Sequence, residues 1–189
     1  MADVITIAGS PSIPSRSGVL LAHIRTLLED DGVSTDAIAV RHLNADDLVA
    51  ARTEAPSIQD ALGRIQQARA VIVGTPIYKA AYSGLLKVFL DLLPQNAFHD
   101  KVVFPIATGG APGHLLAIDY SLKPLLGALG AQHILSGLYV LDAQIHYQDD
   151  ELIWLDPTVE QRLRAGLQSL AQSLVTPPLR AEAPILRIK

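Results

Sequence analysis

Residues 70–74 read Ala-Val-Ile-Val-Gly (AVIVG), and this stretch is the clearest buried strand in the sequence. It is short, free of polar side chains and rich in β-branched residues, which is typical of a strand covered on both faces. Helical spacing precedes it at residues 58–68 and follows it at 83–93, where Pro94 ends the second helix. The stretch therefore predicts a strand that runs between two helices.

The same alternation continues in both directions along the chain. Further strands are predicted at 4–8, 35–43, 101–107 and 133–141, and further helices at 17–29, 114–129 and 157–174. Apolar strands that alternate with helices form a parallel sheet whose two faces are both covered. We therefore expect an α/β, flavodoxin-like fold: a five-stranded parallel sheet in the order 2-1-3-4-5 with helices on both faces.

The predicted domain covers residues 1–175, and residues 176–189 form a separate tail. Pro177, Pro178 and Pro184 argue against a helix in this tail. Its apolar side chains, such as Leu179 and Ile185, would be unusual on a free chain end. We expect the tail to pack on a neighbouring subunit of a homo-dimer or tetramer.

The composition argues against several classes of protein. The 189 residues carry a net charge of −4 and contain no Lys/Arg run, so no nucleic-acid partner is expected. No apolar stretch approaches the roughly 18 residues of a membrane span, and no signal peptide is recognised. The absence of cysteine removes disulfides and thiolate chemistry. These features predict a cytoplasmic protein with no membrane contact.

The loop after the first strand, GSPSIPSRSG at residues 9–18, has the composition of an anion site. It matches neither G-x-x-x-x-G-K-[ST] nor G-x-G-x-x-G, the two best-known phosphate loops. Hydroxyl groups, a helix N-terminus and one guanidinium suit a terminal phosphate, and here they come from Ser10, Ser15, Arg16 and Ser17. The alternative is a plain polar loop in which Ser15 or Ser17 caps the helix. The position after strand 1 favours phosphate.

The loop after the third strand, TPIYKAAYSG from residue 75, favours a flat apolar ligand such as an isoalloxazine ring. Ile77 and Tyr78 would contact such a ring, and Lys79 is retained as a cofactor contact against the alternative of a solvated side chain. Alternatively, Tyr78 and Tyr82 could pack on the rim of the sheet or on another subunit, and for Tyr82 we favour this alternative.

The loop after the fourth strand, TGGAPGH from residue 108, is rich in glycine. Small residues let the backbone approach a planar ring closely, whereas the alternative is that the glycines serve only the turn. Because the carboxyl ends of parallel strands meet at one edge of the sheet, we expect all three loops to form one site.

Pro124 lies inside the helical pattern of residues 114–129. Proline has no N–H for the carbonyl of Tyr120 and its ring crowds that carbonyl, so the helix must kink or form a π-bulge around Tyr120. The alternative is a plain proline kink. Polar clusters at residues 42–47 and 146–151 are interpreted as exposed loops, and we predict no metal site.

Four segments together resemble one family: GSPSIPSRS, GTPIYKAAYSGLLKVFLDLLP, FPIATGG and HLLAIDYSLKPLLGALGA. They are similar to the NADPH-dependent FMN reductases of two-component alkanesulfonate monooxygenase systems. The likeness runs from the first strand to about residue 140. It implies a flavodoxin-like fold, FMN and NADPH as cofactors, and delivery of reduced FMN to an FMN-dependent monooxygenase.

The resemblance also implies roles for individual residues. The FMN phosphate would be held by Ser10, Ser15, Arg16 and Ser17. The ring would be held by Pro76, Ile77, Tyr78, Lys79, Thr108, Gly109 and Gly110. Tyr120 matches the inserted tyrosine of a π-helix that is linked in this family to tetramer contacts and to flavin release.

Two other functions share the predicted fold. A flavodoxin-like electron carrier would keep FMN bound and need no nicotinamide site. A quinone or azo reductase would use FMN and NADPH but reduce an organic acceptor. We expect hydride transfer from NADPH to the flavin N5, with the flavin supplying the chemistry and no protein acid or base strictly required.

Overall fold

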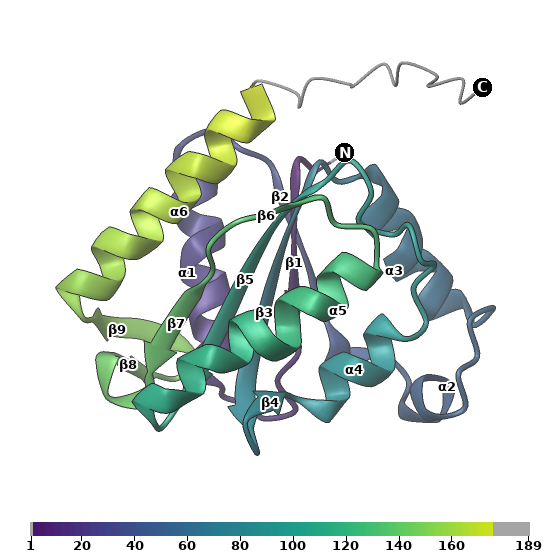
Figure 1. Cartoon of the computed structure of the whole chain (residues 1–189), viewed down its shortest axis with the longest axis horizontal. Coiled ribbons are helices and arrows are strands. Elements are labelled where there is room, and N and C mark those ends of the chain that lie inside the picture. The colour runs from purple at the N-terminus through teal and green to yellow at the C-terminus, as the bar shows by residue number, and fades with distance from the viewer. Residues whose placement is uncertain (1, 176–189) are drawn as a thin grey trace, which may run out of the picture.

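The computed structural model describes residues 2–175, so the predicted tail at 176–189 lies outside the described residues. Parallel strands form the central sheet in the order β2-β1-β3-β5-β6, with β7 also paired to β5 (Figure 1). The strands are β1 (Val4–Ala8), β2 (Thr35–Ala39), β3 (Ala70–Tyr78), β5 (Val102–Gly109), β6 (His133–Ile134) and β7 (Leu138–Leu141). This order confirms the predicted flavodoxin-like α/β fold.

The helices cover both faces of the sheet, as the apolar strands require (Figure 1). On one face lie α1 (Arg16–Asp30) and α6 (Pro157–Val175), which share a core with Ile72 and Phe104. On the other lie α3 (Pro56–Gln67), α4 (Gly84–Leu90) and α5 (Lys123–Ala128), packed around Val71 and Phe98. The short helices η1 (Val40–His42) and α2 (Ala45–Val49) join β2 to α3.

The stretch AVIVG is the first part of β3, the strand between β1 and β5. Its side chains are fully buried, and the strand continues through Thr75 and Pro76 to Tyr78, beyond the predicted end at Gly74. The loop predicted after Gly74 is therefore partly strand. A two-residue strand β4 (Ala81–Tyr82) turns back and pairs with the end of β3.

Two predicted strands are shorter or broken. The strand expected at 35–43 ends at Ala39, because the chain turns into η1. The strand expected at 133–141 is divided into β6 and β7, and Gly137 lies in the interruption with φ at +90°. Residues other than glycine rarely adopt this backbone conformation, so the glycine permits the break between β6 and β7.

The helix predicted at 114–129 has three different segments. A 3₁₀ turn, η2 (Pro112–Leu115), is followed by a π-helix, η3 (Ile118–Leu122), and then by α5. The predicted π-bulge around Tyr120 is thus confirmed. Pro124 stands at the start of α5, where its missing N–H has the least effect on the helical hydrogen bonds.

The structure contains an antiparallel hairpin that was not predicted from the sequence. It consists of β8 (Ile145–Gln148) and β9 (Glu151–Leu155), preceded by η4 (Asp142–Gln144). Residues 146–151, interpreted as an exposed loop, form most of its first strand and its turn. Asp149 and Asp150 occupy the turn with φ at +49° and +65°, the left-handed pair that a tight hairpin needs.

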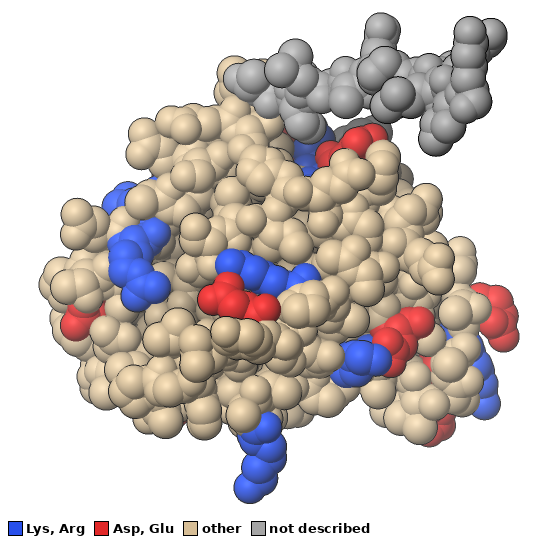
Figure 2. Space-filling model, in the orientation of Figure 1, with Lys and Arg blue, Asp and Glu red and all other residues tan. Residues whose placement is uncertain are grey.

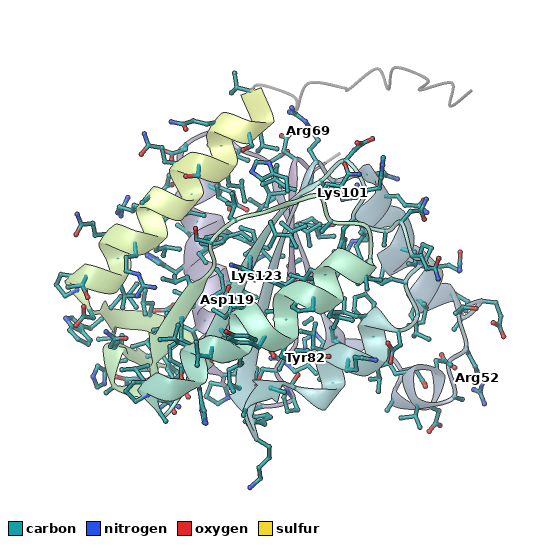
Figure 3. All side chains as sticks on the ribbon, viewed as in Figure 1. Arg52, Arg69, Tyr82, Lys101, Asp119 and Lys123 are labelled. Atoms are coloured by element: carbon teal, nitrogen blue, oxygen red, sulfur yellow. The ribbon has the colours of Figure 1, made fainter. Side chains whose placement is uncertain are left out.

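Two basic side chains make hydrogen bonds at the end of the sheet where β3 and β5 begin (Figure 3). Arg69 donates to the carbonyl of Leu174 near the end of α6 and also pairs with Asp3. Lys101 donates to the carbonyls of Gln66 and Ala68 beside the C-terminus of α3. Burial lowers the pKa of the Lys101 ammonium.

Basic and acidic side chains are interspersed on the face shown in Figure 2. Among the described residues, no helix is both long and apolar enough to cross a membrane.

Gly74 has a packing role that a substitution can test. A Cβ placed there would lie 2.7 Å from Cδ1 and 2.8 Å from Cγ of Leu21, which α1 lays over β3. We expect Gly74→Ala to lower the free energy of unfolding by about 1–3 kcal/mol through overpacking. Urea unfolding measures this value.

Gly63→Ala is the matched control, because no atom of the described residues lies within 4 Å of a Cβ at this position in α3. It should raise the free energy of unfolding by roughly 0.5–1 kcal/mol, since alanine favours a helix over glycine. Equal effects at the two glycines would contradict the packing role of Gly74.

Candidate functional site

The three predicted loops meet at the carboxyl edge of the sheet and enclose a half-open cleft of about 180 Å³. The cleft contains most of the predicted site residues: Ser10, Ser15, Arg16, Ser17, Pro76, Ile77, Tyr78, Thr108, Gly109 and Gly110. Ser12, Pro14, Asp142 and Tyr147 complete its lining. The parallel register brings these residues together, because Pro76 lies opposite Thr108 where β3 and β5 approach their ends.

One end of the cleft is the N-terminus of α1. Ser15 caps the helix, and its hydroxyl accepts a hydrogen bond from the Gly18 N–H at 3.1 Å. The first N–H groups of the helix, those of Arg16 and Ser17, have no partner within the helix. The loop is ordered by a second contact, in which the Ser12 N–H donates to the Ser10 hydroxyl at 3.2 Å.

Two buried polar atoms at this end have no hydrogen-bond partner among the described residues, Ser17 Oγ and Arg16 Nε. Buried polar groups without a partner are costly and rare in native proteins, so each of these two atoms requires a partner such as a ligand or an ordered water. A phosphate would satisfy both atoms together with the free N–H groups. The residues present therefore fit the phosphate predicted for this loop.

Arg16 has two neighbours that the sequence analysis did not identify. Its Nε lies 3.7 Å from Oδ1 of Asp142, and its guanidinium carbon lies 5.9 Å from the centre of the Tyr147 ring. Asp142 belongs to η4 and Tyr147 to β8. The missed hairpin therefore contributes a wall of the site.

A buried network joins the first loop to the second. The Ser83 hydroxyl donates to the Gly9 carbonyl, while the Ser83 N–H donates to Thr75 Oγ1 at 3.0 Å. The Gly9 N–H donates to the Gly74 carbonyl at 2.8 Å. A Cβ on Gly9 would lie 2.7 Å from Cβ of Leu86, so this close approach requires glycine.

The other end of the cleft is built from the ends of β3 and β5, where the backbone of Gly109 and Gly110 lies beside Ile77 and Tyr78. Gly109 passes over Tyr139, and a Cβ on this glycine would lie 2.6 Å from the tyrosine hydroxyl. That hydroxyl donates to the Ala111 carbonyl at 2.8 Å and fixes the glycine-rich loop. Burial, with the nearby charge of Asp142, raises the pKa of Tyr139. The hydroxyl therefore stays protonated as a donor.

Under this end lies a small apolar cluster that links the loops to the π-helix. It consists of Ile77, Ala107, Ala117, Ile118 and Tyr139. Ile77 and Tyr139 are 6% and 7% exposed, whereas Tyr78 at the rim is 48% exposed. A flat ligand in the cleft would thus have a rigid base and one accessible aromatic neighbour.

Two predicted residues lie outside the cleft lining. Lys79 is exposed in the turn between β3 and β4, with φ at +50°. Tyr120 is 81% exposed on the π-helix. Tyr82 packs against the core beside α4, as expected (Figure 3). Within residues 2–175, no group of three metal-ligating side chains gathers.

The cleft lies at the carboxyl ends of β1, β3 and β5 of a flavodoxin-like sheet, which is where proteins of this fold bind FMN. The model of one family, NADPH-dependent FMN reductase, matches residues 2–146. The chain belongs to this family. It is an oxidoreductase that reduces FMN, with NADPH as the nicotinamide cofactor.

Known proteins are similar over most of their length. The FMN reductase (NADPH) of Pseudomonas putida strain KT2440 is 45% identical over 176 residues, which is 93% of this chain and 89% of the relative. The FMN reductase (NADPH) of Escherichia coli K12 is 44% identical, covering 90% of this chain and 89% of the relative. The apo structure of an NADH:FMN oxidoreductase has a TM-score of 0.83 at 32% identity, covering 94% of this chain and 92% of that one.

The contact between Tyr139 and Ala111 can be tested by Tyr139→Phe. Loss of a hydrogen bond worth about 0.5–1.5 kcal/mol should raise the FMN dissociation constant about 2- to 12-fold, because the glycine-rich loop is no longer fixed. Fluorescence titration with FMN measures the change. Tyr82→Phe, outside the cleft lining, is the control and should bind FMN as the parent does. An unchanged constant in Tyr139→Phe would remove the hydroxyl from the site.

Proposed function

We propose that the cleft holds FMN with its phosphate at the N-terminus of α1 and its ring on the shelf formed by residues 76–78 and 108–110. The observation that carries the proposal is a pair of buried atoms, Ser17 Oγ and Arg16 Nε, that have no hydrogen-bond partner within residues 2–175. They lie at one end of a cleft whose other end combines glycine backbone with Ile77 and Tyr78. This arrangement, with polar donors at one end of the cleft and backbone and apolar side chains at the other, matches a ligand with an anionic tail and a flat, mostly apolar head.

In this proposal, the residues of the chain position the flavin ring. Gly109 and Gly110 leave room for the ring, Ile77 supports the shelf from below, and Tyr78 stands at its rim. When bound, the flavin supplies the chemistry by accepting a hydride from NADPH at N5. The half-open cleft leaves one side of the shelf accessible to the nicotinamide.

We further propose that reduced FMN leaves the cleft and supplies an FMN-dependent monooxygenase of the alkanesulfonate type, in the cytoplasm. The four segments quoted above support this partner by resemblance. Relatives include two proteins of Pseudomonas putida named NADH-dependent FMN reductase SfnF and SfnE, 32% and 31% identical. Their names show that the nicotinamide cofactor differs between relatives.

Tyr120 is proposed to act in flavin release and in the assembly of a homo-dimer or tetramer. Its side chain points away from its own subunit's core, whereas Ile118 on the same π-helix packs with Ile77 and Tyr139 beneath the shelf. A contact made by Tyr120 with another subunit would therefore be transmitted to the loops that support the ring.

Delivery of reduced FMN can be tested with the reductase and an alkanesulfonate monooxygenase on opposite sides of a dialysis membrane. Sulfite should form when FMN, NADPH and the sulfonate are supplied in air. NADPH consumption without sulfite, even when the two proteins are mixed, would reject this partner. Retention of all FMN by the chain would favour an electron carrier, and faster turnover of a quinone or azo dye than of FMN would favour the third function.

Arg16→Ala tests the phosphate seat. A charge-assisted hydrogen bond contributes about 1.5–3 kcal/mol, so the FMN dissociation constant should rise about 10- to 150-fold. Riboflavin, which lacks the phosphate, is the matched ligand, and its affinity should hardly change. Equal losses for the two flavins would show that Arg16 acts on the fold or on the ring.

Tyr120→Ala tests the π-helix. Because the side chain is 81% exposed, its removal should leave the subunit folded but reduce the size of the assembly or change the rate of FMN dissociation. Light scattering and stopped-flow fluorescence measure the two quantities. Val49→Ala, which truncates a 79% exposed side chain on α2, is the control. If neither quantity moves, the π-helix is only a local distortion.

A further inference from the structure

Asp142 lies between the two ends of the cleft. Its Oδ1 is 3.7 Å from Arg16 Nε at the phosphate end. Its Oδ2 is 3.6 Å from the point that a Cβ on Gly110 would occupy at the ring end. A carboxylate therefore stands inside a site whose ligand carries a phosphate.

The contact between Asp142 and Arg16 is loose. At 3.7 Å it is an ion pair without a hydrogen bond, and Arg16 Nε has no hydrogen-bond partner among residues 2–175. Both side chains are partly exposed, 40% for Arg16 and 43% for Asp142, and such pairs contribute little to stability. The carboxylate thus does not lock the guanidinium, but it remains close enough to compete for it.

The two neighbours of Arg16 act differently on an incoming anion. Tyr147 presents an aromatic ring to the guanidinium, which orients the cation without neutralising it. Asp142 carries the same sign of charge as the flavin phosphate and must give up its share of Arg16 when the phosphate binds. In addition, its charge repels the phosphate.

We propose that Asp142 sets the affinity for FMN by competing with the flavin phosphate for Arg16, so that FMN stays exchangeable. This inference rests on the proposed function, in which Arg16 holds the phosphate. A reductase that hands its flavin to another protein needs a weak hold on it. In this chain one carboxylate counteracts the phosphate seat without altering the serines or the backbone of the cradle.

The test is Asp142→Asn, which keeps the shape of the side chain and removes its charge. FMN should bind about 5- to 30-fold more tightly, the effect of a unit charge near the phosphate in a partly solvated site. FMN should also dissociate more slowly in stopped-flow fluorescence. The gain should shrink when salt is raised, because screening weakens contacts between exposed charges.

Two comparisons isolate the effect of the charge on the phosphate. Riboflavin affinity should stay constant in Asp142→Asn, since riboflavin has no phosphate. Asp60→Asn makes the same change in net charge at a 69% exposed side chain of α3 and should leave FMN affinity unaltered. Tighter riboflavin binding in Asp142→Asn, or weaker FMN binding, would overturn the proposal; the second result would mean that Asp142 orients Arg16.

Arg16→Ala separates this inference from the function on which it rests. If Arg16→Ala leaves FMN affinity unchanged, the phosphate seat itself is wrong. If Arg16→Ala weakens FMN but Asp142→Asn has no effect, only the competition is wrong. In the double variant the gain from Asp142→Asn should be smaller than in the parent, and a full gain there would overturn competition through Arg16.

Discussion

The hydroxyl of Ser83 makes the contact on which the rest of the site depends. It donates to the Gly9 carbonyl at the end of β1, while the backbone of the same residue donates to Thr75 in β3. All of these groups are buried, so the network is not weakened by water. Ser83 also caps α4 by accepting from the Leu86 N–H. One residue thereby fixes the distance between the loop after β1, the end of β3 and α4.

Around this network, the residues that shape the cleft differ from the residues that set its charge and exposure. The loops after β1 and β5 consist largely of serine and glycine, and Ile77 and Tyr139 belong to the apolar cluster that packs beneath the cleft. The residues that set charge and exposure come from the hairpin region and from the strand ends, where they contact the solvent. In the site proposed for FMN, this division allows the affinity for FMN to change without a change in the geometry of the cleft.

The sequence was sufficient for the parts of the molecule that local physics dictates. Apolar β-branched runs located the strands, and Pro124 predicted the distortion at Tyr120 because a missing N–H disturbs its own helix. Ser15 and Arg16 were recognisable because they follow β1. Sequence reasoning did not identify the neighbours of Arg16 because Asp142 and Tyr147 are distant from it along the chain. Tyr139 was not identified because its partner, Ala111, belongs to a different strand-end loop. Asp-Asp is also a less familiar hairpin turn than Asn-Gly, so residues 146–151 were interpreted as an exposed loop.

Both edges of the sheet are unsuited to pairing with a strand of another molecule. At β2, Ala37 has its N–H bonded to the Asp36 carboxylate at 2.7 Å and its carbonyl bonded to Arg64 at 2.6 Å. At the opposite edge, the interruption at Gly137 leaves pieces of only 2 and 4 residues. Unprotected edges are templates for aggregation, and short or charge-capped ones resist it. The sheet therefore resists edge-to-edge pairing by two different means, side-chain capping at β2 and an interrupted strand at the opposite edge.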